Sequence, residues 1–147
     1  MSKSKWLERC VLAHPDLTLC LTEKAFSAAY RHVFRSRKDS PEMPIWVDDD
    51  ADAMMHTLSE GADILACIVC LDDSSVGTLS QLVALMAHEA QHVVQEVQRQ
   101  HNALPLGDDE MECRLLDHIT MRLMESYMEQ TNRPDKLPRR RAGSGHR

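Results

Sequence analysis

One stretch constrains the fold of this chain more than any other, the apolar run from Leu79 to Val97 that carries His88-Glu89-Ala90-Gln91-His92. Apolar residues recur along it at helical spacing, which predicts an amphipathic helix that ends at about Gln100. Thr78 and Gln81 stand where the N-cap and third residue of a capping box belong. Such a helix has to bury its apolar side, so the rest of the chain is expected to pack around it.

The two histidines of this run are four residues apart, so a helix places them on one face, one turn from each other. Imidazole nitrogens in that position can bind one zinc ion at about 2.0–2.1 Å. Glu89 lies beside the first histidine and can reach a water in the open coordination position. This H-E-x-x-H arrangement, with His88 and His92 as ligands and Glu89 as general base, is typical of zinc metallopeptidases. The alternative is an exposed polar stripe shared with Gln95, Glu96 and Arg99. The apolar surroundings favour the metal site.

Catalytic zinc normally takes a third protein ligand. A second helix is predicted from about Asp108 to Thr131, and it carries two candidate carboxylates, Glu110 and Glu112. The apolar stripe of this helix slightly favours Glu112, but periodicity alone leaves the choice open.

The length and composition of the chain limit the number of domains and the classes of partner. A chain of 147 residues is sufficient for one domain, which we expect at residues 1–132, followed by a disordered basic tail at residues 133–147. The net charge of −6 argues against nucleic-acid binding, except through Arg139, Arg140 and Arg141 in that tail. No apolar segment reaches membrane-spanning length and the first residues do not lead into a signal sequence, so we expect a cytoplasmic protein.

Taken in order, the chain predicts a short helix within residues 1–14, a helix from an N-cap at Thr22 to about Arg35, and a short strand at residues 45–47. Residues 54–60 fit either a helix or a strand. Residues 64–71 fit a strand, with a hairpin turn at residues 61–63. The aspartates at positions 48, 49, 50 and 52 lack the spacing of a calcium loop and are read as a solvated turn.

Several single residues are expected to be structural. Cys67 and Cys70 are three apart on a strand, so they should point to opposite faces and fill the core. His56 is expected to be a structural histidine, with a place in the cleft as the alternative. His118 is expected to be exposed, and His101 to lie at the end of the motif helix.

The motif and the helix predicted after it resemble a known pattern. His88-Glu89-x-x-His92 followed by Glu110-x-x-Cys113 is similar to the gluzincin pattern H-E-x-x-H and E-x-x-A. The stretch from about Ala51 to Tyr127 resembles small zincin-like proteins of tailed phages and prophages. This resemblance implies Glu110 as the third zinc ligand, with Glu112 as the alternative. It implies a zincin-like α+β fold, mostly helical, with a small sheet or hairpin on the motif helix.

The resulting hypothesis is a zinc-dependent metallopeptidase that acts on a protein or peptide substrate. Zn²⁺ would be held by His88, His92 and Glu110, and Glu89 would accept the proton of the attacking water. Residues 64–71 are the candidate for a strand that aligns the peptide. Two alternatives remain: a non-catalytic zincin-fold module that binds phage structural proteins or belongs to the virion, and a protease associated with nucleic acid through the basic tail.

Overall fold

The computed structural model describes residues 6–7, 15–100 and 109–132. The described chain is an α+β fold with three α-helices and a mixed four-stranded sheet, which confirms the predicted class. Its elements in chain order are β1 (Trp6–Leu7), β2 (Asp16–Cys20), α1 (Glu23–Phe34), β3 (Ala53–Glu60), β4 (Asp63–Leu71), the short 3₁₀ turn η1 (Asp73–Ser75), α2 (Leu79–Gln100) and α3 (Asp109–Thr131).

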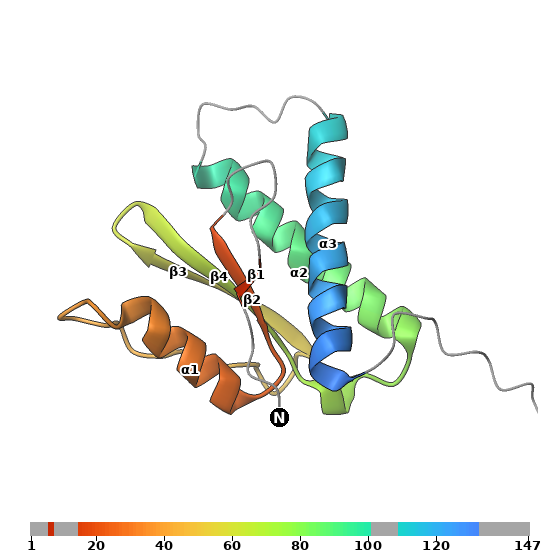
Figure 1. Ribbon diagram of the computed structural model, residues 1–147, viewed down its shortest axis with the longest axis horizontal. Helices are drawn as coiled ribbons and strands as arrows, with labels where there is room; N and C mark the ends of the chain where they lie inside the picture. The colour runs from red at the N-terminus through yellow and green to blue at the C-terminus, as the bar shows by residue number, and fades with distance from the viewer. Residues whose placement is uncertain (1–5, 8–14, 101–108, 133–147) are drawn as a thin grey trace, which may run out of the picture.

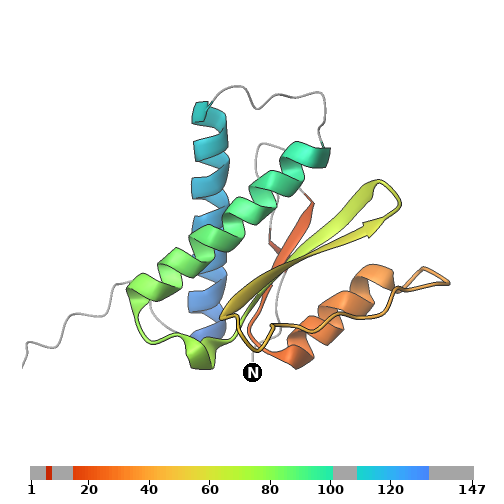
Figure 2. The same cartoon turned by 180° about the vertical axis from the view of Figure 1, so that it is seen from behind.

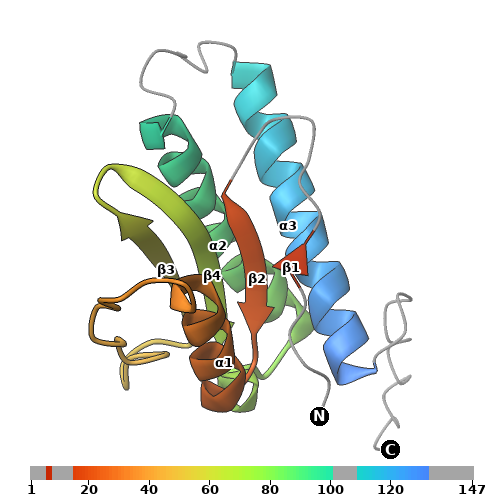
Figure 3. The same ribbon diagram turned by 60° about the vertical axis from the view of Figure 1, so that its left-hand side comes forward.

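The sheet forms the middle layer of the molecule. Its strand order is β1-β2-β4-β3, with β2 parallel to β4 and the other neighbours antiparallel. Helix α1 covers one face, and α2 and α3 cross each other on the other face (Figures 1 and 3). Since both faces are covered, the central strand β4 is a nearly continuous apolar run, in agreement with the rule for buried strands.

Alternation along β4 divides the core into two parts. Cys67, Val69 and Leu71 pack in the cluster shared with α2 and α3. Ile68 and Cys70 pack in the cluster shared with α1. The prediction that Cys67 and Cys70 point to opposite faces is therefore confirmed, and both side chains are fully buried.

Local signals determine how the helices begin. The Thr22 hydroxyl accepts a hydrogen bond from the backbone N–H of Ala25 at 3.1 Å, so Thr22 is the N-cap of α1 as predicted. The Thr78 hydroxyl accepts from the N–H of Gln81 at 3.1 Å at the start of α2. The Gln81 side chain accepts from the N–H of Gly77 at 3.0 Å, one residue before the position that a standard capping box would use.

The predicted hairpin is confirmed, and the ambiguous segment before it is the strand β3. The turn between β3 and β4 contains Gly61 at φ 59°, a conformation that favours glycine. Strand β3 pairs only with β4 among the described strands, so β3 is an edge of the sheet (Figure 2).

The strands differ from the sequence-based picture in four respects. Trp6–Leu7 forms a strand paired with β2 and not a helix, and the other residues of the predicted 1–14 helix lie outside the described ones. Residues 45–47 form no strand, although Val47 is buried in the cluster under α1. Strand β2 was not predicted. Finally, β4 lies between β2 and β3 and therefore has no open edge for a peptide.

The remaining expectations concern membrane-spanning segments, the basic tail and His101. No helix in the described part of the chain is both long and apolar enough to cross a membrane. The basic tail and His101 lie outside the described residues.

Candidate metal centre

Helix α2 brings the two motif histidines together. His88 is exposed and His92 half-buried, and both lie beside the apolar side of the helix that packs into the core. Their Nε2 atoms are 3.2 Å apart, and the rings meet edge to face at 82° with centroids 4.8 Å apart. The i, i+4 spacing thus has the expected effect: the two Nε2 atoms meet on one face of the helix, at a separation that also allows a hydrogen bond between the rings.

This separation fits a shared metal ion. Two ligands at about 2.0–2.1 Å from a tetrahedral zinc ion lie about 3.3–3.4 Å from each other. The observed 3.2 Å is close to that value. The Nδ1 atom of His92 lies 3.3 Å from Oε1 of Gln95. In the tautomer in which Nδ1–H donates to Gln95, Nε2 carries the lone pair that a metal needs. Metal-binding histidines usually donate their other ring N–H to an oxygen acceptor in this way.

Glu89 lies between the histidines and the sheet. Its exposure is 4%, and burial raises the pKa of its carboxyl group. His88 and His92 oppose that shift, as does a hydrogen bond from the backbone N–H of Met55 in β3. The Glu89 carboxyl group therefore lies in a partly apolar site next to both histidines, and the hydrogen bond with Met55 holds it to the edge strand β3. A general base needs this proximity to a water held at the two nitrogens.

The structure does not bring Glu110 to the histidine pair. Glu110 lies in the first turn of α3, mostly exposed, and its Oε1 accepts from Nε of Arg114 at 3.0 Å. Glu112 is half-buried and precedes the buried Leu115 by three residues, so it lies nearer the packed side of α3. Within the described ranges, no three His, Cys, Asp or Glu residues form a group that could hold a metal ion.

The other histidines and Tyr127 have structural surroundings. His56 stacks on Phe26 with ring centroids 4.8 Å apart, and its Nε2 is 2.9 Å from the carbonyl oxygen of Trp46. The structural interpretation of His56 is thus confirmed, and its alternative place in the cleft is wrong because the ring lies on the α1 side. His118 is half-buried and not exposed, and its Nε2 has no hydrogen-bond partner among the described residues. Tyr127 is buried and its hydroxyl donates to Asp73.

Sequence reasoning missed a second buried carboxylate on α2. Glu96 is 8% exposed and pairs with Arg99, whereas from the sequence it was considered only within the alternative of an exposed polar stripe. Glu96 follows Glu89 by seven residues, which is two helical turns, and Val93 lies between them on the same side. That spacing was the available signal, because seven residues along a helix return to the same face.

Comparisons with protein-family models, with curated proteins and with solved structures give no match for this chain.

Proposed function

We propose that this protein is a zinc-dependent metallopeptidase in which His88 and His92 bind the ion and Glu89 is the general base. The observation that carries the proposal is the 3.2 Å approach of the two Nε2 atoms, with the Glu89 carboxyl group beside them. An ordinary surface stripe on a helix does not require a buried carboxylate next to two converging imidazoles.

Zinc bound at these nitrogens would polarise a peptide carbonyl and lower the pKa of a bound water to about 7. Glu89 would accept the proton of that water and deliver it to the leaving amine. Glu110 remains the proposed third ligand and Glu112 the alternative, and either would require α3 to approach the histidine pair more closely.

The edge strand β3 replaces β4 as the element proposed to align the substrate. An extended peptide can pair with the outer backbone groups of an edge strand. Because the N–H of Met55 donates to Glu89, a peptide paired with β3 would run past the proposed base. The substrate is therefore proposed to be an unfolded segment or a flexible loop, which can adopt a strand.

Replacement of Glu89 by Gln tests this function. Glu89→Gln keeps the size of the side chain and removes its basicity, so zinc content should be unchanged and hydrolysis of unfolded protein, such as reduced casein, should fall at least about 100-fold. Glu125→Gln changes an exposed carboxylate on α3 and should retain full activity. If zinc-loaded Glu89→Gln cleaved casein as fast as the unaltered chain, the proposal would be wrong.

A second candidate is a non-catalytic module that keeps the zinc site, such as an assembly protein of a phage particle. It is favoured by one observation: Glu110 pairs with Arg114 and does not join the histidine pair. Bound zinc without turnover on any unfolded substrate would select this candidate.

A further inference from the structure

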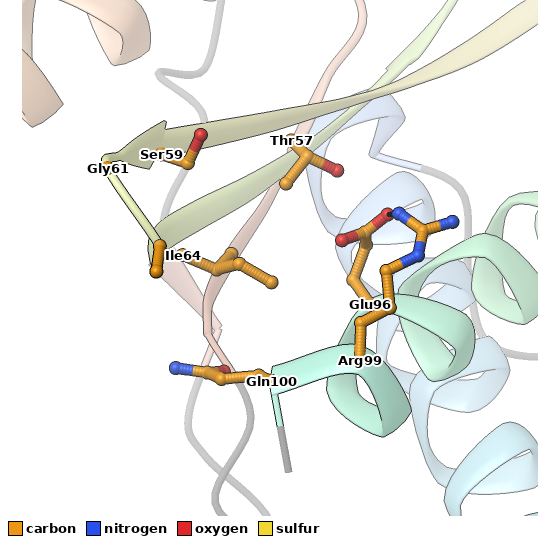
Figure 4. A pocket seen from close by; sticks show the side chains of 8 residues that line it. Thr57, Ser59, Gly61, Ile64, Glu96, Arg99 and Gln100 are labelled. Carbon is orange, nitrogen blue, oxygen red and sulfur yellow. Dashed lines mark hydrogen bonds and ion pairs between the residues drawn. The ribbon is translucent and has the colours of Figure 1, made fainter. Parts of the chain in front are cut away.

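A second polar site lies along α2 beyond the histidine pair. It is a cavity of about 430 Å³ between the end of the β3–β4 hairpin and the last turns of α2. Residues of the hairpin and of the helix line it: Thr57, Ser59, Gly61, Ala62, Ile64, Glu96, Arg99 and Gln100. Figure 4 shows Thr57 and Ile64 pointing from the strands toward Glu96 and Arg99 on the helix.

The two charged residues of this cavity, Glu96 and Arg99, differ in the exposure of their side chains. The Glu96 side chain is only 11% exposed and its carboxylate accepts from Nη1 of Arg99. The Arg99 side chain is 71% exposed. Glu96 is thus a fixed negative charge in the wall of the cavity, whereas the Arg99 guanidinium can move into water at little cost because it is already largely hydrated.

This difference favours a cation as the occupant of the cavity. A lysine or arginine side chain that enters can pair with the buried carboxylate while Arg99 moves outward. An acidic side chain would approach a buried carboxylate that cannot move away, which is unfavourable at short range. The net charge of −6 on the whole chain also favours the approach of a basic partner.

The position of the cavity relative to Glu89 determines which substrate residue would reach the cavity, counted from the cleaved bond. Glu89 contacts β3 at Met55, and the cavity meets β3 at Thr57 and Ser59, two and four residues further along. At about 3.3 Å per residue, a peptide paired with β3 reaches the cavity about 7–13 Å from the reacting bond. Side chains two or four residues from that bond face the same side as each other.

From these observations we infer that the cavity binds a lysine or arginine side chain of the substrate, two or four residues from the cleaved bond. This inference rests on the proposed peptidase function for the cleaved bond. The recognition of a basic peptide by Glu96 does not depend on turnover.

Peptide binding to the Glu89→Gln protein tests the inference without hydrolysis. The probes are fluorescein-labelled ten-residue Ala/Ser peptides with one Lys, one norleucine or one Glu at the same position, and binding is measured by anisotropy. We expect the Lys peptide to bind about tenfold more tightly than the norleucine peptide, and this difference to disappear when Glu96→Gln is added. Adding Arg99→Gln should tighten the Lys peptide, because the competing guanidinium is gone.

A matched control is available on α3. Glu125 pairs with Arg122 at the same i, i+3 spacing as Glu96 and Arg99 but lies away from the cavity, so Glu125→Gln should leave peptide binding unchanged. Circular dichroism checks that each variant is folded. Equal binding of the three peptides to a folded protein, or a preference for Glu, would overturn the inference.

Cleavage-site mapping separates this inference from the proposed function. On a digest of reduced casein, we expect Lys or Arg to be enriched two or four residues from the cleaved bonds. Cleavage without this preference would refute the basic-side-chain site alone. Absence of cleavage together with preferential Lys binding would refute the peptidase and keep the site.

Discussion

Glu89 and Glu96 are buried carboxyl groups on one helix, two turns apart, and each has a different source of stabilisation. A buried carboxylate is costly unless it is paired or accepts hydrogen bonds. Glu89 has two histidines and a backbone N–H nearby, whereas Glu96 has an arginine from its own helix. An apolar residue at either position would avoid this cost, and the two carboxyl groups instead form a polar row on the side of α2 that lies next to β3.

The buried cysteines Cys67 and Cys70 should react more slowly with alkylating agents than the exposed Cys113. Burial, together with the nearby Glu96, raises the pKa of Cys67 to about 12. A hydrogen bond with Cys20, followed by burial, raises the pKa of Cys70. Because the thiolate is the reactive form, both thiols should resist iodoacetamide at pH 8 in the folded protein, whereas the exposed Cys113 should be alkylated within minutes to hours.

Mass spectrometry of the tryptic peptides measures this difference, and alkylation in guanidinium serves as the control, where all cysteines should react. If Cys67 and Cys70 were labelled in the folded protein as fast as Cys113, the packing described for β4 would be wrong.

At the scale of elements, the first turn of α2 should stabilise the fold independently of the proposed metal centre. Thr78→Ala removes the hydroxyl that accepts from the N–H of Gln81, and we expect a loss of about 1 kcal/mol in the free energy of unfolding. His88 lies ten residues further along, about 15 Å away, so zinc affinity should not change. Urea denaturation and zinc titration measure the two quantities.

Ser80 provides the matched control, because it is an exposed hydroxyl residue on the same turn. Ser80→Ala should change stability by less than about 0.5 kcal/mol. Equal losses from Thr78→Ala and Ser80→Ala would contradict the capping role of Thr78.

The three helices and the hairpin could be predicted because their signals are local. Thr22, Thr78 and Gly61 act on residues next to them, and the apolar spacing of α1, α2 and α3 repeats within each helix. Strands β1 and β2 depend on partners distant in sequence. Leu17 to Cys20 are buried on both faces of the sheet, so they show no alternation that would have marked a strand.

The same distinction holds for the candidate site. The convergence of His88 and His92 follows from the geometry of one helix and was predictable. Whether Glu110 or Glu112 reaches them depends on how α3 packs on α2, which periodicity within one helix does not encode. The edge position of β3 depends on the strand order of the whole sheet, and the sequence therefore pointed to β4 instead.

At the scale of the whole molecule, the candidate site and the cavity occupy the same side of the structure. Helix α2 lies beside the hairpin and contacts both β3 and β4 (Figures 1 and 2). Three features follow in order along α2, next to the edge strand β3: the histidine pair, Glu89 and the cavity at Glu96. An extended peptide that pairs with β3 would pass both places, so this alignment supports the proposed register of the substrate.

The most direct test of the proposed metal centre is the zinc content of the purified protein, measured by inductively coupled plasma mass spectrometry after exposure to equimolar Zn²⁺ and gel filtration. We predict about one zinc per chain, retained in His32→Gln, which alters an exposed histidine on α1, and lost in both His88→Ala and His92→Ala. Equal zinc content in all four proteins, or no zinc in any of them, would contradict the claim that His88 and His92 form a metal centre.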